Sequence, residues 1–105
     1  MIVEFYPKAK SDITRQIRYY LNQQQAASTA VRFRSAVIYS IEQLSPHPGM
    51  VVNVRRSISG LRCWPVKGFE KILIYYLAKQ ETISIVRVLH GSRNVSQILQ
   101  HEKVQ

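Results

Sequence analysis

The stretch EKILIYYLAKQETISIVRVL, residues 70–89, holds two apolar runs separated by a short polar segment. Both runs are rich in β-branched and aromatic residues, which favour strands. The segment Lys79–Glu81 between them is too short for a crossover connection, so the two strands are predicted to be antiparallel neighbours. The run ILIYYL is apolar on both faces. This predicts a central strand that helices cover.

The chain N-terminal to these strands carries the patterns of one strand and two helices. Residues 2–6, IVEFY, predict a short strand that Pro7 ends. Ser11 or Asp12 is placed to cap a first helix, and Ser28 is placed to cap a second one. The apolar residues at helical spacing are Ile13, Ile17, Tyr20 and Leu21 in the first helix and Ala30, Phe33, Val37, Ile41 and Leu44 in the second.

The rest of the chain completes a mixed pattern of helices and strands. The segment SPHPG, residues 45–49, ends the second helix because proline lacks the amide hydrogen that a helix needs. Residues 50–59 fit an edge strand or an extended loop, residues 60–64 fit a strand, and residues 94–100 fit a short last helix. The predicted fold is α+β in the order β-α-α-β-β-β-α. An N-terminal strand is followed by an α-helical hairpin packed on an antiparallel sheet and by a short C-terminal helix, in a single domain over residues 1–105.

The composition indicates a basic protein of a reducing compartment. Fifteen Lys and Arg against six Asp and Glu give a formal net charge of +9, which predicts a nucleic acid or an acidic protein as partner. The alternative is that the charge serves only solubility. Cys63 is the only cysteine, so no internal disulfide can form, and this favours the cytoplasm. The sequence predicts neither a membrane span nor a secretion signal, so we expect no membrane partner.

Motifs for catalysis or metal binding are weak. His47, His90, His101 and Cys63 do not have the spacing of metal ligands, and the four glycines form no phosphate-binding loop. We therefore expect no metal and no cofactor. Metal-free RNA cleavage remains possible chemically, because it needs only an acid or base and cations on the phosphate. His90 is the candidate acid or base, because histidine is the side chain that ordinarily titrates near neutral pH. The alternative role of His90 is a hydrogen bond to the backbone of the turn. The candidate cations are Arg62, Arg87, Arg93, Lys67 and Lys71.

Two longer motifs carry a family resemblance. They are LRCWPVKGFEKILIYYL at residues 61–77 and IVRVLHGSRNVSQIL at residues 85–99. Their leucine–arginine strand, Pro-x-x-Gly-aromatic turn and Val-Arg-Val-Leu-His-Gly ending resemble the ParE branch of the RelE/ParE superfamily of bacterial toxins. Asn94 stands where family members carry an aspartate, and this change keeps the helix-capping role.

The resemblance implies a toxin that binds its target without catalysis. RelE-type members cut messenger RNA, and Arg93 falls on one of their arginines. Their arginine before the central strand and their C-terminal tyrosine fall on Ile72 and Leu99, which cannot stabilise phosphate charge or move a proton. ParE-type members instead bind DNA gyrase, so the resemblance implies a gyrase inhibitor. The alternatives are a RelE-like ribosome-dependent mRNA endoribonuclease and a degenerate module that binds only its antitoxin.

The same resemblance implies the partners. They are a cognate acidic antitoxin that folds on the toxin in a hetero-oligomer, DNA gyrase, and operator DNA reached indirectly through the antitoxin. An acidic segment that folds on binding requires an apolar surface with a basic rim. Arg62 and Arg87 have simple solvation as their alternative, and Trp64 has a place in the core as its alternative. The candidate target- and antitoxin-binding residues are Arg55, Arg56, Arg62, Trp64, Lys67, Arg87, His90 and Arg93.

Overall fold

The computed structural model describes residues 2–23, 26–44, 50–51, 60–79, 81–91 and 95–100. In these residues the elements follow the predicted order, and the segment that fitted an edge strand contributes a two-residue strand. The α+β fold class is confirmed. The elements are β1 (Ile2–Phe5), α1 (Pro7–Leu21), α2 (Ala26–Glu42), β2 (Met50–Val51), β3 (Arg62–Val66), β4 (Phe69–Lys79), β5 (Thr82–His90) and α3 (Val95–Gln100).

The described strands form one mixed sheet in the order β1-β5-β4-β3-β2. The pairs β3–β4 and β4–β5 are antiparallel, as their short connections predict. Gly68 closes the first of these turns with a φ of +83°, a conformation that favours glycine. β1 is parallel to β5, so the expectation of a wholly antiparallel sheet is wrong at this edge. The helical hairpin separates these two strands in sequence, and a connection of that length permits parallel pairing.

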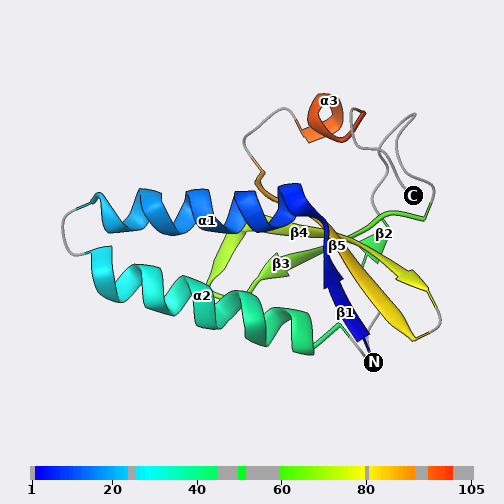
Figure 1. The fold of residues 1–105 in the computed structure, drawn as a ribbon, viewed down its shortest axis with the longest axis horizontal. Coiled ribbons are helices and arrows are strands. Elements are labelled where there is room, and N and C mark those ends of the chain that lie inside the picture. The colour runs from blue at the N-terminus through cyan, green and yellow to red at the C-terminus, as the bar shows by residue number, and fades with distance from the viewer. Residues whose placement is uncertain are drawn as a thin grey trace.

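The hairpin of α1 and α2 lies across one face of the sheet (Figure 1). Tyr20 of α1, Phe33 of α2 and Phe69 of β4 pack with ring centroids 5.4 to 5.8 Å apart, in tilted and edge-to-face geometry. Such contacts between aromatic rings add to the gain from burial. The predicted stripe of α2 is buried here. The buried residues of this helix-side core are Ala9, Phe33, Val37, Ile41, Leu44, Val66, Ile72, Ile74, Tyr76, Ile83, Ile85 and Val88.

A second core covers the opposite face of β4. Successive residues of a strand point to opposite faces, so Tyr75 and Leu77 alternate with the helix-side residues Ile74 and Tyr76. Leu99 of α3 is fully buried in this core, and α3 lies away from the hairpin (Figure 1). The run ILIYYL is therefore central and covered on both faces. The buried residues of the second core are Leu61, Cys63, Tyr75, Leu77, Val86, Leu89 and Leu99.

The first helix begins earlier than its predicted cap. α1 starts at Pro7, with Tyr6 as the N-cap residue and no side-chain capping bond. Proline is favoured at the first helical position because the amide it lacks would have no partner there. Ser11 lies inside the helix, where its hydroxyl donates to the Pro7 carbonyl at 3.2 Å. Asp12 is buried in the helix rather than capping it.

We expect the Cys63 thiol to react slowly because it lies in the second core. Burial raises the pKa of the Cys63 thiol, so the reactive thiolate becomes rarer. We expect the native chain to react with Ellman's reagent at about pH 8 at least about 100-fold more slowly than the chain in concentrated guanidinium chloride. Absorbance of the released thiol measures both rates. Rates within about tenfold of each other would contradict this burial.

Candidate interaction surfaces

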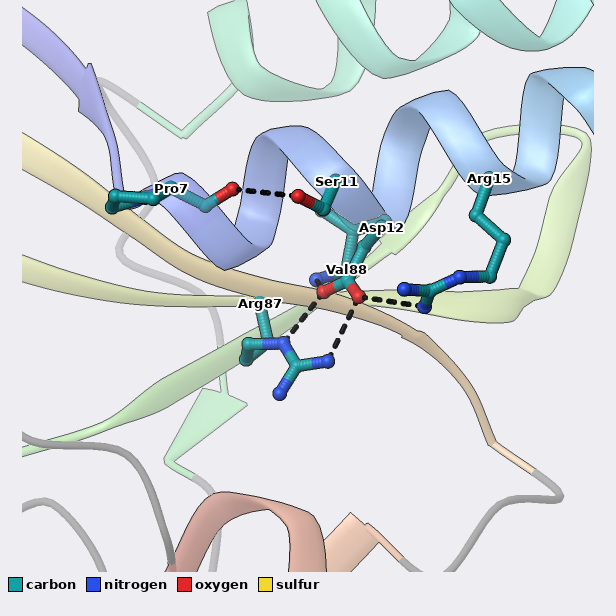
Figure 2. Close-up of polar contacts among 6 residues, drawn as sticks. All are labelled: Pro7, Ser11, Asp12, Arg15, Arg87 and Val88. Carbon is teal, nitrogen blue, oxygen red and sulfur yellow. Dashed lines mark hydrogen bonds and ion pairs between the residues drawn. The ribbon is translucent and has the colours of Figure 1, made fainter.

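Asp12 of α1 accepts three hydrogen bonds from β5 (Figure 2). Its Oδ2 accepts from Nε of Arg87 at 2.7 Å and from the backbone N–H of Val88 at 3.0 Å. Its Oδ1 accepts from Nη2 of Arg87 at 2.8 Å. The Asp12 and Arg87 side chains are 2% and 10% exposed. A bidentate pair with additional hydrogen bonds is the geometry in which buried opposite charges satisfy each other.

The Asp12 carboxylate also completes an edge of the sheet. β1 pairs with β5 only as far as Ile85, whose carbonyl accepts from the N–H of Tyr6 at 2.9 Å. The chain then turns away into α1, so β1 does not extend along the last part of β5. The carboxylate supplies an acceptor for the N–H of Val88, which a neighbouring strand would otherwise satisfy.

Arg87 does not lie on an exposed basic rim, where the sequence placed it. The residue is 8% exposed, and its guanidinium donates to Asp12 of α1. Tyr75 is opposite Arg87 and Tyr76 is opposite Ile85, so β5 contains one extra residue between them. A bulge of this kind bends a strand and changes the direction of its side chains. The expected exposure is wrong for this physical reason, and a role for Arg87 in binding stays a prediction.

The end of β5 forms a pocket with the turn between β3 and β4. His90 is half-buried and lies opposite Ile72 on β4. The N–H of Gly91 donates to the carbonyl of Lys71 at 2.7 Å, and a Cβ at Gly91 would lie 3.4 Å from that oxygen. The pocket measures about 420 Å³, and Tyr20 contributes to its lining together with these strand residues. Its polar side chains include Glu70, Lys71 and His90, while Ile72 is buried.

Three predicted binding residues lie along β3 and its turn. Arg62 is half-buried and lies near the Tyr76 hydroxyl. Burial raises the pKa of the Tyr76 hydroxyl, and the Arg62 guanidinium opposes this change. Trp64 packs against the helix-side core, as its alternative role predicted. Lys67 is exposed at the turn, and its backbone N–H donates to Oγ of Ser40 at 2.9 Å.

The structure does not gather the five predicted residues that it describes at one site. Trp64 and Lys67 share a smaller pocket of about 280 Å³ with Tyr39, whereas His90 lines the other pocket. Arg55, Arg56 and Arg93 lie outside the described residues. Which of the eight residues contact a partner therefore stays a prediction.

The outer surface of the hairpin was not among the predicted binding residues. Val31 and Ile38 are 66% and 48% exposed, and seven residues apart they lie on the same side of α2. A helical projection of residues 26–42 places this second apolar row roughly 110° around the helix from the buried one, so the sequence does contain a signal for it. The exposed cations of the two helices are Lys8, Lys10, Arg15, Arg18, Arg32 and Arg34.

The described residues contain no group of three or more His, Cys, Asp and Glu that could hold a metal ion. No helix in this part of the chain is long and apolar enough to cross a bilayer.

Comparison with known proteins gives the family. A family model described as ParE toxin of the type II toxin–antitoxin system parDE matches residues 3–95. The chain belongs to the ParE toxin family. The ParE branch suggested by the two sequence motifs is thereby confirmed, and the chain is assigned to the toxins of type II toxin–antitoxin systems.

A solved structure supports the same fold. The ParE-family chain is similar to a chain of the chromosomal ParDE toxin–antitoxin system from P. aeruginosa, with a TM-score of 0.70 and 15% sequence identity. The match covers 86% of this chain and 95% of the other. Among curated protein sequences, no significant match to the chain is found.

Replacing Asp12 should destabilise this ParE-family fold strongly. Asp12→Ala leaves the buried Arg87 charge and the Val88 N–H without their acceptor, so we expect a loss of about 3 to 5 kcal/mol in the free energy of unfolding. Urea denaturation followed by Trp64 fluorescence measures this loss. Arg15→Ala is the matched control. The Arg15 side chain is 63% exposed, so its 3.5 Å contact with Asp12 should contribute under about 1 kcal/mol to the free energy of unfolding. A change below about 1 kcal/mol for Asp12→Ala would contradict the assigned role.

Proposed function

We propose that this toxin inhibits DNA gyrase by binding it, without catalysing a reaction, and that a cognate acidic antitoxin neutralises it in the cytoplasm. The match to the ParE family model over residues 3–95 carries the proposal. The toxin would then form a hetero-oligomer with the antitoxin and reach operator DNA through it.

Three side-chain environments support binding over catalysis. Ile72, at the position of an expected nuclease arginine, is 4% exposed and packs in the helix-side core. Leu99, at the position of an expected nuclease tyrosine, is buried in the second core. Arg87 is engaged by Asp12, so its charge is already neutralised within the fold. RNA cleavage requires a positioned acid or base and free cations on the phosphate.

The hairpin offers the surface that an acidic antitoxin segment needs. Val31 and Ile38 supply exposed apolar area on α2, and Arg34 lies one turn from each of them. Lys10 of α1 adds a further exposed cation on the hairpin. An amphipathic antitoxin helix would bury its apolar face on Val31 and Ile38 and place acidic residues near the cations.

Gyrase inhibition can be measured with purified components. We expect the toxin to reduce the supercoiling of relaxed plasmid by gyrase. Arg93→Ala should raise the toxin concentration needed for half inhibition at least about tenfold, because interface arginines often contribute more than about 1.4 kcal/mol to binding. Lys79→Ala, an exposed change at the β4–β5 turn, is the control and should behave as the wild type.

The competing functions give different results in the same system. Undisturbed supercoiling together with fragmented messenger RNA in a translation reaction would favour the endoribonuclease. Undisturbed supercoiling and intact messenger RNA would favour a degenerate module that binds only its antitoxin. Either result would overturn the proposal.

Antitoxin binding should depend on the α2 surface. The probe is the protein encoded by the reading frame next to the toxin gene, and calorimetry measures its affinity. Val31→Asp/Ile38→Asp should weaken binding at least about tenfold, since each substitution would bury a carboxylate or lose apolar contact. Ile2→Asp, an equally exposed apolar residue on β1, is the control. The association rate should fall as salt is added, because opposite charges steer the encounter. Unchanged affinity of the double variant would place the antitoxin elsewhere.

A further inference from the structure

One side of α1 consists entirely of polar and cationic side chains. At 100° per residue, six exposed residues of α1 and its C-cap lie within roughly 100° of the helix circumference. We call this group the α1 stripe. It comprises Lys8, Ser11, Arg15, Arg18, Tyr19 and Asn22.

The stripe contains no acidic residue. The only acid of α1 is Asp12, which is buried at the border of the stripe and held by Arg87. Arg15 is 63% exposed, and its contact with Asp12 is a single 3.5 Å approach. The positive charge of Arg15 and Arg18 therefore faces solvent with little cancellation from the helix itself.

We propose that the α1 stripe binds the phosphate backbone of duplex DNA directly and without sequence preference. This goes beyond contact with DNA through an antitoxin or through gyrase. The hydroxyl of Ser11 already donates to the Pro7 carbonyl, and the other residues of the stripe are of types that donate hydrogen bonds to phosphate oxygens in protein–DNA interfaces. Lys8 and Arg18 are ten residues apart, which is ~15 Å along the helix, and a duplex carries one phosphate per about 1.7 Å of its axis. Several phosphates lie within reach of the stripe.

The composition of the stripe favours duplex DNA over the other anionic partners. A protein interface has an apolar centre, and the exposed aliphatic side chains of α2, Val31 and Ile38, lie on the other helix. Single-stranded nucleic acid is bound by rings on which bases stack. Tyr19 is the only aromatic residue of the stripe, and it packs edge-on against Tyr20 at 5.7 Å between centroids. A row of cations and of hydroxyl or amide groups along a helix instead fits the phosphate backbone of duplex DNA, which is rigid.

The test uses matched pairs of substitutions in the purified chain made by cell-free translation. Fluorescence anisotropy measures binding to a labelled duplex of about 25 base pairs with arbitrary sequence, from about 50 mM to about 200 mM salt. Arg15→Ala/Arg18→Ala removes two charges from the stripe. Arg32→Ala/Lys79→Ala removes two exposed charges elsewhere, on α2 and at the end of β4. Urea denaturation checks that both variants remain folded.

We expect wild-type binding that weakens as salt is added. The stripe variant should bind about tenfold more weakly at the lowest salt, and the slope of log affinity against log salt should shrink by about 1.8, or 0.9 per lost phosphate contact. The control variant should keep the wild-type slope. Because gyrase and antitoxin are absent from this measurement, its result does not depend on the function proposed above.

Four results would overturn the proposal. They are no binding of the wild type at the lowest salt, equal losses in both variants, tighter binding to the single strand of the same sequence, and tighter binding to poly-L-glutamate. Equal losses would assign the effect to net charge alone. The last two would assign the stripe to single-stranded nucleic acid or to an acidic protein.

Discussion

The carboxylate of Asp12 fixes the relation between the helical hairpin and the sheet. It holds the first half of α1 against β5 through Arg87 and Val88, while the Tyr20 ring holds the second half against Phe33 and Phe69. Removing two charges from water offsets much of the attraction between them. The main effect of the Asp12–Arg87 pair is therefore to fix the position of α1 on the sheet, more than to add stability. Only one placement of α1 brings the carboxylate to the guanidinium and to the open backbone N–H together, so the pair selects that placement.

The same carboxylate determines the charge of the protein surface. An exposed aspartate at this point would stand among Lys8, Arg15 and Arg18 and would reduce their combined field. Because Arg87 neutralises it inside the fold, the solvent side of α1 keeps only cations and neutral polar groups. A contact that orders the core thus also separates the charges of α1, with the Asp12–Arg87 pair balanced inside and the cations of the helix exposed outside.

Patterns within short segments were sufficient to predict the elements and most of the core. The central strand and the α2 stripe follow from spacings of two and of three to four residues, and Leu99 followed from the last helix. The sequence did not predict contacts between distant residues. Asp12 and Arg87 are 75 positions apart, and nothing local distinguishes a capping aspartate from one that accepts bonds across a sheet edge. Arg87 was accordingly assigned to the rim, and the parallel pairing of β1 was missed because it too joins segments distant in the chain.

The hairpin has two surfaces, the apolar row of Val31 and Ile38 on α2 and the cationic α1 stripe, and ionic screening weakens the effect of charge at one on the other. Packed helices lie about 8 to 10 Å apart, and the α1 stripe is on the side of α1 away from α2. At physiological ionic strength the screening length is about 8 Å, so acidic groups docked near Val31 and Ile38 would lower the potential at the stripe only slightly. The two surfaces would then bind their partners almost independently. An antitoxin seated on α2 would leave the stripe able to contact phosphates, and in a complex on operator DNA the stripe would add backbone contacts beside those of the antitoxin. In the function proposed above, neutralisation of the toxin would then come from covering the surface that meets the target, because charge compensation over that distance is weak.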